Sequence, residues 1–156
     1  MNAILRILDE AKLAITTQLI YVRREAPGFT PLVLERVFDP PPAPIGAITH
    51  LSMAHYFIQN GDLMADPEIT FSVYKLTDYP GLETLGIVAR DSSGTAWLFI
   101  PTSVKMDSIA DYQESFVGED PEALLVSKSG QRAKCTFCRQ WDLNIRNQGF
   151  FTCVPS

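Results

Sequence analysis

AITHLSMAHYFIQNGDLMADPEITFSVY, residues 47–74, is the stretch that decides the fold. Residues 47–58 are a long run that favours a strand, and residues 68–74 alternate between polar and apolar side chains. Alternation with a period of two is typical of a strand with one buried face. Asn60-Gly61 favours a turn between them, because both residues tolerate a positive φ. The stretch therefore predicts a β-hairpin with an ordered loop over residues 59–68.

Segments on both sides of this hairpin predict the remaining elements. Residues 84–89 and 95–100 flank a polar, glycine-containing turn and predict a second hairpin, and residues 32–38 predict an earlier strand. Apolar residues at spacings of three and four predict helices over residues 2–24 and 129–147. Gly149 lies where a left-handed helix cap is expected. Residues 107–117 suit a helical turn or an irregular crossing segment.

Together these elements predict an α+β fold. An antiparallel sheet of about five strands would have the N-terminal and C-terminal helices packed on one face. Hairpin connections favour antiparallel pairing, because parallel neighbours need crossover connections. The 156 residues are 46% apolar and 20% charged, which suits a single globular domain over residues 1–156.

The composition also narrows the function classes. A net charge of −5 argues against a surface devoted to non-specific nucleic-acid binding. No apolar run approaches the roughly 18–20 residues of a membrane span, so we expect no membrane partner. The N-terminus carries Asp9 and Glu10 and lacks the features of a secretory signal, which favours the cytoplasm. Three cysteines are too few for a secreted disulfide framework, so reduced thiols are expected.

The predicted loop concentrates the groups with the most chemical potential. Asp62, Asp66 and Glu68 are a candidate oxygen-ligand set for Mg²⁺ or Ca²⁺, with His55 as a ligand or general base. Their spacing matches neither the calcium-loop pattern nor that of zinc peptidases. The simplest interpretation is that turn residues set the loop and its carboxylates are solvated. A third interpretation is a binding surface made of Tyr56, Gln59, Asn60, Asp62, Asp66 and Glu68.

The cysteines suggest a metal site only weakly. Cys135-x-x-Cys138 has the spacing of half a zinc site, but Cys153 alone follows it, and no strand precedes it as in redox motifs. We expect Cys138 to pack on the apolar face of the helix, Cys135 to be a bystander, and no cofactor. His50 and His55 fall on opposite faces of a regular strand, so they are not expected to share a metal.

The C-terminal helix is basic. Residues 128–147 contain five cations and one carboxylate, a net +4 within a chain of −5. An ordinary solvated helix face explains this pattern best, although a contact with nucleic acid or an acidic protein would also suit it. Phe137 and Trp141 are expected to face the core. The cations are Lys128, Arg132, Lys134, Arg139 and Arg146.

Two motifs resemble those of an uncharacterised domain family found in proteins of bacterial plasmids, integrative elements and phages. They are His55-Tyr56-x-x-Gln59-Asn60-Gly61-Asp62-Leu63-Met64-x-Asp66-Pro67-Glu68 and Trp141-x-x-Asn144-Ile145-x-x-Gln148-Gly149-Phe150. The first is fairly specific and the second is modest; Ile145 stands where leucine is expected. The resemblance implies a mobile-element setting and a cytoplasmic accessory role, and it assigns no catalytic residue. The Cys135–Cys138 pair belongs to neither motif, which puts cysteine-based chemistry in doubt.

The leading prediction is therefore a cytoplasmic accessory protein that binds an unidentified protein partner through the hairpin loop and its polar surroundings, without catalysis. The motifs of common hydrolases, kinases and dinucleotide enzymes are absent. The alternative is a divalent-metal-dependent hydrolase or nuclease that uses Asp62, Asp66 and Glu68 with His55. A second alternative is an acidic anti-defence protein whose carboxylates imitate DNA phosphates.

Overall fold

The computed structural model describes residues 1–118 and 123–151 of the chain. Its long hairpins are built from β3 (Thr49–Gln59) with β4 (Asp62–Lys75) and from β5 (Ile87–Arg90) with β6 (Ala96–Met106). The helices are α1 (Asn2–Glu10) and α2 (Lys128–Asn147). The shorter strands are β1 (Tyr21–Arg24), β2 (Leu32–Arg36), β7 (Asp111–Glu114), β8 (Phe116–Val117) and β9 (Leu124–Leu125). Three 3₁₀ turns complete the described elements: η1 (Leu76–Asp78), η2 (Glu83–Leu85) and η3 (Asp107–Ile109).

Seven of the strands form one antiparallel sheet in the order β1-β2-β3-β4-β6-β5, with β7 also paired to β6. Strands β8 and β9 form a separate two-stranded ribbon. The predicted α+β class is confirmed, but the sheet has seven strands where about five were predicted. The two additional strands are β1, which lies within the predicted N-terminal helix, and β7, which lies within the segment predicted as a turn or crossing.

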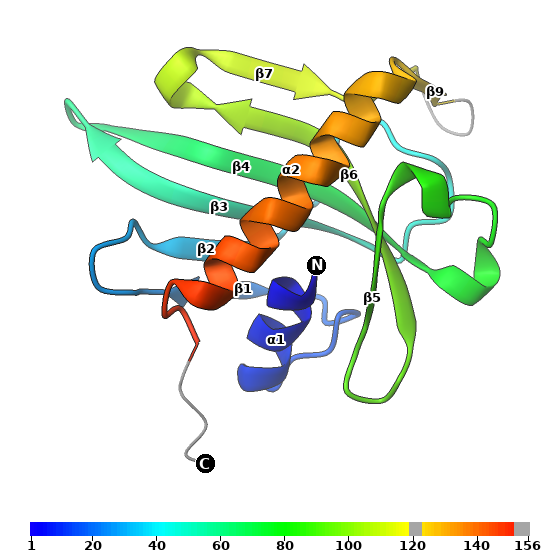
Figure 1. The fold of residues 1–156 in the computed structure, drawn as a ribbon, viewed down its shortest axis with the longest axis horizontal. Helices are drawn as coiled ribbons and strands as arrows, with labels where there is room; N and C mark the ends of the chain where they lie inside the picture. The colour runs from blue at the N-terminus through cyan, green and yellow to red at the C-terminus, as the bar shows by residue number, and fades with distance from the viewer. Residues whose placement is uncertain (119–122, 152–156) are drawn as a thin grey trace.

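Both helices pack on the same face of the sheet, as predicted (Figure 1). On this helix face, apolar side chains of the central strands and of both helices form one core cluster. Burial of this apolar surface is the main favourable contribution to folding. The contributing side chains include Ile4 and Ile7 of α1, Leu51, Met53, Phe71 and Phe99 of the strands, and Cys138, Trp141 and Ile145 of α2.

The predicted N-terminal helix over residues 2–24 is wrong in its second half. Helix α1 ends at Glu10, and the chain continues irregularly until β1 begins at Tyr21. The β-branched residues Ile15, Thr16 and Thr17 disfavour a helix because their side chains crowd the preceding turn. Strand β1 instead pairs with β2, where Val22 lies opposite Leu34.

The ordered loop predicted between β3 and β4 is also wrong. Asn60 and Gly61 form a tight turn with φ values of 52° and 85°, and β4 begins at Asp62. Gln59 lies directly opposite Asp62. The ladder is irregular between Ala54 and Tyr56, where both Asp66 and Pro67 lie across from His55. The polar residues of the motif are therefore strand residues, and the alternation of a strand assigns them to different faces.

A buried carboxylate joins the two helices. The Ala3 N–H donates to Asp142 Oδ1 at 2.8 Å, and Asp142 Oδ2 lies 3.1 Å from Arg146 Nε. Asp142 thus satisfies an N–H group at the start of α1, where no helical carbonyl can accept it. Helix α2 is capped locally, because Gly130 N–H donates to Ser127 Oγ at 3.0 Å. Gly149 has φ +86°, as expected for its cap position.

The second face of the sheet is only partly covered. At one end Tyr74, Leu98, Ile100 and Phe116 form a second apolar cluster. Towards the hairpin tip this face carries polar side chains, of which Glu35, Tyr56 and Glu68 remain partly exposed whereas Ser52, Thr70 and Ser103 are buried. We call this second region the open face. Its side chains are those of Tyr21, Arg23, Val33, Glu35, Ser52, Ala54, Tyr56, Ile58, Leu63, Glu68, Thr70, Ser103, Lys105, Tyr112 and Glu114.

Gly86 offers a test of the close contact at the start of β5. A Cβ atom at this position would lie 2.4 Å from the carbonyl oxygen of Phe99, a backbone atom that cannot swing aside. We expect Gly86→Ala to lower the free energy of unfolding by about 1–3 kcal/mol, as overpacking does. The matched control is Gly81→Ala, because a Cβ there meets nothing within 4 Å. Urea denaturation of both variants measures the difference, and equal stability would contradict the close contact.

Candidate functional site

The end of the β3–β4 hairpin extends beyond the neighbouring strands (Figure 1). We call residues 56–65 the hairpin arm. Its side chains on the open face are unusually apolar, since Ile58 is 68% exposed and Leu63 is 65% exposed. Tyr21, on edge strand β1, which β2 separates from β3, is 62% exposed and lines the same groove. Large apolar side chains that cluster on a surface mark interaction sites more often than isolated ones do.

A groove of about 430 Å³ lies between the hairpin arm and strands β1 and β2. Because its walls come from strands of one sheet, the hydrogen-bonded ladder fixes their spacing. The groove combines apolar side chains with two tyrosine rings, one arginine and one carboxylate. It is lined by Tyr21, Arg23, Pro31, Val33, Glu35, Tyr56, Phe57, Ile58 and Leu63.

A cluster of two carboxylates and two hydroxyls adjoins the groove. Tyr56 OH donates to Glu35 Oε1 at 3.3 Å, and Ser52 Oγ donates to Glu68 Oε1 at 3.4 Å. We call Glu35, Ser52, Tyr56 and Glu68 the acidic cluster. Between them lies Ala54, which is fully buried and too small to separate the longer side chains.

Two members of the acidic cluster, Glu68 and Tyr56, have raised pKa values. Burial raises the pKa of Glu68, and the charge of Glu35 raises it further, although Lys105 and the Ser52 hydroxyl oppose the shift. Burial likewise raises the pKa of Tyr56, and the negative charges of Glu68 and Glu35 add to this effect. The half-buried carboxylates thus repel each other, and each holds only a weak hydroxyl hydrogen bond.

Cations near the open face are already paired. Lys105 Nζ lies 3.5 Å from Asp107 Oδ2, and Arg23 Nη2 lies 2.9 Å from Glu25 Oε1. Within residues 1–118 and 123–151, neither Glu35 nor Glu68 has a cation within 4 Å. The open face therefore presents negative charge that the described part of the chain leaves without an ion pair.

His55 lies on the helix face, on the other side of the sheet from Tyr56. Its Nδ1 lies 3.0 Å from the Thr30 carbonyl oxygen, so this nitrogen carries the proton and donates. The ring packs against Trp141 and Phe150, with centroid distances of 5.7 and 5.4 Å. Burial lowers the pKa of His55, which keeps the ring neutral near pH 7. His50 lies on the opposite face, as predicted, with Nδ1 2.8 Å from Ser72 Oγ.

The aromatic contacts of His55 bring the two quoted motifs together in space. His55 belongs to the first motif, whereas Trp141 and Phe150 belong to the second. The motif residues between them are also structural, since Ile145 is fully buried and Gly149 adopts a positive φ. These parts of the two motifs therefore specify how α2 attaches to β3.

The three candidate carboxylates have different surroundings. Asp62 is exposed beside the turn with Gln59 and Asn60, Glu68 is half-buried on the open face, and Asp66 lies across the ladder from His55. Six residues of strand, about 20 Å, separate Asp62 from Glu68. Among the residues that the structure describes, no three His, Cys, Asp or Glu side chains are grouped to hold a metal ion.

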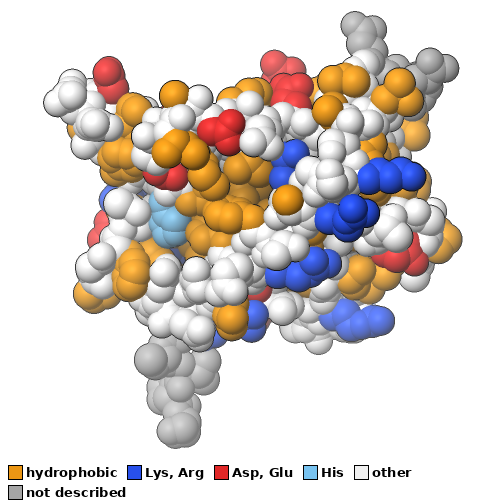
Figure 2. Space-filling view, turned by 45° about the horizontal axis from the view of Figure 1, so that its top comes forward, with side chains coloured by type: hydrophobic (Ala, Val, Ile, Leu, Met, Phe, Trp, Pro, Cys, Tyr) orange, Lys and Arg blue, Asp and Glu red, His pale blue; other side chains and the backbone are white. Residues whose placement is uncertain are grey.

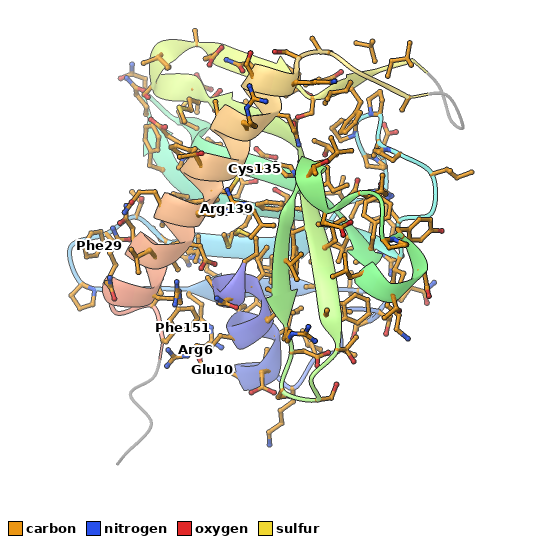
Figure 3. The ribbon with its side chains drawn as sticks, turned by 45° about the vertical axis from the view of Figure 1, so that its right-hand side comes forward. Arg6, Glu10, Phe29, Cys135, Arg139 and Phe151 are labelled. Atoms are coloured by element: carbon orange, nitrogen blue, oxygen red, sulfur yellow. The ribbon has the colours of Figure 1, made fainter. Side chains whose placement is uncertain are left out.

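Both described cysteines are structural. Cys138 is buried in the core, as predicted, but Cys135 is also buried and its Sγ donates to the Leu85 carbonyl at 3.5 Å, so it is not a bystander (Figure 3). Burial raises the pKa of both thiols, which disfavours the reactive thiolate. Cys153, the third predicted ligand, lies outside the described residues.

The cations of α2 lie apart from the groove. Lys128, Arg132 and Arg139 are exposed, and basic side chains gather on the right-hand half of Figure 2. Trp141 is buried as predicted, whereas Phe137 is 37% exposed, and its ring is tilted against that of Trp141 with centroids 6.5 Å apart. At the other end of the helix face, Arg6 lies 4.3 Å from the ring centroid of Phe151 (Figure 3).

Sequence reasoning predicted Tyr56 and Glu68 as binding residues but missed the residues that complete the surface. Glu35 and Ser52 lie on strands that were correctly predicted, yet only the register brings them beside Tyr56 and Glu68. Tyr21 was assigned to a helix. The apolar pair Ile58 and Leu63 could have been found, because they flank the Asn60-Gly61 turn at positions that pair in a tight hairpin.

The fold and the site define a small α+β domain with a helix-covered face and an open, acidic face. The chain belongs to a family described as a domain of unknown function (DUF6908), whose model matches residues 2–151. This confirms the resemblance to an uncharacterised domain family. No curated protein and no solved structure matches the chain. In the described part of the chain, no helix has the length and apolar character needed to cross a membrane.

The buried ring of His55 predicts sensitivity to acid. Because its pKa is lower in the folded chain than the ordinary value of 6.5, the unfolded chain binds a proton first as the pH falls. Stability should therefore decrease below about pH 6.5. Melting temperatures of wild type and His55→Gln, measured at about pH 7.5 and about pH 5.5, should show a smaller acid-induced decrease in the variant. His50→Gln is the control for the other histidine, and identical decreases in wild type and His55→Gln would contradict the assignment.

The raised pKa of Glu68 predicts that its contribution to stability changes with pH in the opposite direction. Its pKa is raised in the folded chain, so the folded chain retains a proton where the unfolded chain has lost it, and stability decreases as the pH rises through the folded value. We expect Glu68→Gln to melt at a higher temperature than wild type at about pH 7.5, and at the same temperature at about pH 4. The exposed control Glu83→Gln should show no such gain. A Glu68→Gln protein less stable than wild type at neutral pH would refute the prediction.

Proposed function

We propose that this chain is a single-domain binding module that engages a protein partner through the groove and the acidic cluster of its open face. The observation that carries the proposal is the exposure of Ile58, Leu63 and Tyr21 around a groove with a polar border. Protein interfaces combine an apolar centre with a polar rim, and tyrosine is enriched in them.

The sheet supports this role mechanically. The hairpin arm is a continuation of the two central strands, so ladder pairing holds Ile58 beside Leu63 on one wall of the groove. A preorganised surface loses less conformational entropy on binding than a flexible loop does. The predicted binding residues Tyr56 and Glu68 belong to this surface, and Gln59, Asn60 and Asp62 lie at its exposed tip.

The proposed role also has a proposed origin and location in the cell. The two motifs support an accessory protein of a bacterial mobile element, and the composition supports action in the cytoplasm. The hydrolase or nuclease alternative needs Asp62, Asp66 and Glu68 to act together. Their separation along β4 supports binding over shared catalysis.

Substitution of the apolar rim tests the function. A partner should co-purify with the tagged wild-type protein from its native host. We expect the amount of this partner to fall at least tenfold with the double variant Ile58→Asp/Leu63→Asp, because two charges would replace the apolar contact. The matched control is Leu124→Asp/Val126→Asp, which introduces the same two charges at side chains that are 67% and 58% exposed and lie outside the groove. Quantitative mass spectrometry measures the partner, and unchanged melting temperatures confirm folding. Equal recovery with both variants would contradict the proposal.

A further inference from the structure

We infer that the open face receives an extended partner segment that carries an apolar side chain and, near it, an arginine or lysine. The apolar side chain would occupy the groove, and the cation would lie between Glu35 and Glu68 beside the Tyr56 ring. This inference rests on the proposed function and specifies the chemistry of the partner.

The groove has room for one large side chain of a partner. Ile58 and Leu63 pair across the hairpin arm, and Tyr21 lies on edge strand β1, on the far side of β2. They surround a volume of about 430 Å³, which accommodates a large aliphatic or aromatic side chain. Burial of such a side chain supplies the non-specific part of the binding free energy.

The acidic cluster places two carboxylates beside the groove. Glu35 borders the groove, and the Tyr56 hydroxyl links it to the acidic cluster, in which Ser52 holds Glu68. The two half-buried carboxylates repel each other and have only hydroxyl donors. A guanidinium or ammonium group would relieve that repulsion and donate several hydrogen bonds at once. The neighbouring aromatic ring adds a favourable surface for a cation.

The basic side chains on the open face already have carboxylate partners. Lys105 lies directly opposite Glu68 in the ladder and Arg23 lines the groove, but Lys105 pairs with Asp107 and Arg23 pairs with Glu25. The hydroxyl donors and the apolar groove suit an amino-acid side chain better than a bare metal ion, which prefers several oxygen ligands at short range. The complementary charge is therefore expected from a partner, and its apolar neighbour would fix its position.

Selection from a library of random seven-residue peptides displayed on phage tests this inference. We expect wild-type protein to enrich peptides in which an arginine or lysine lies within a few positions of a large apolar residue. Synthetic copies of the best peptides should bind with an affinity at least about tenfold lower to Glu35→Gln/Glu68→Gln, because two charged contacts are lost. The control Asp9→Asn/Glu83→Gln removes the same charge from exposed positions outside the groove and should bind like wild type. Fluorescence polarisation measures the affinities.

The outcomes separate this inference from the proposed function. Enriched peptides without a basic residue, which Ile58→Asp/Leu63→Asp no longer binds, would retain the binding function and overturn the basic partner. Peptides that bind equally to wild type and to Ile58→Asp/Leu63→Asp would overturn the groove as the site, and absence of enrichment would count against both. Concentration-dependent dimerisation that Glu35→Gln/Glu68→Gln abolishes would overturn the separate partner and assign the cation to α2 of a second copy.

Discussion

The register of the β3–β4 ladder is the constraint on which the remaining structure depends. The Asn60-Gly61 turn sets it from the Gln59–Asp62 pair to the Tyr56–Ala65 pair. The irregularity opposite His55 then shifts it by one residue, so that Met53 pairs with Ile69 under the helices. A slip of one residue would exchange this core pair for the polar neighbours Ser52 and Thr70. Because the helix face is packed with apolar side chains, such a slip would place hydroxyl groups in that core and move large apolar side chains out of it. The turn and the core thus specify registers that differ by one residue, and the irregularity opposite His55 reconciles them.

That register gives adjacent residues unrelated roles. His55 and Tyr56 are neighbours in the chain, but the alternation of β3 directs the first towards Trp141 and the second towards Glu35. The irregularity opposite His55 accommodates one additional residue in β4 without disturbing the core further along the ladder. A cluster of reactive groups in the sequence is therefore divided between a structural face and a binding face. The motif is dense because it specifies both.

The parts of the fold that sequence predicted are those where local signals agree with tertiary packing. Helix α2 has a polar cap at Ser127 and a periodic apolar face, and both hairpins have clear turn residues. The prediction for β1 failed because its apolar spacing also fits a helix. Only the pairing with β2 decides between a helix and a strand here. Asp62 and Asp66 suggested a loop because polar residues and proline are depleted in strands. The acidic cluster could not be predicted, since Glu35 and Ser52 join it only through the register across three strands.

The Asp142 contact with Ala3 has a consequence for how the chain folds during synthesis. The two residues are 139 positions apart, and helix α1 has nine residues, too short to be stable alone in water. The ribosome therefore releases α1 before its carboxylate partner is made, so the contact between Ala3 and Asp142 forms only after α2 has been synthesised.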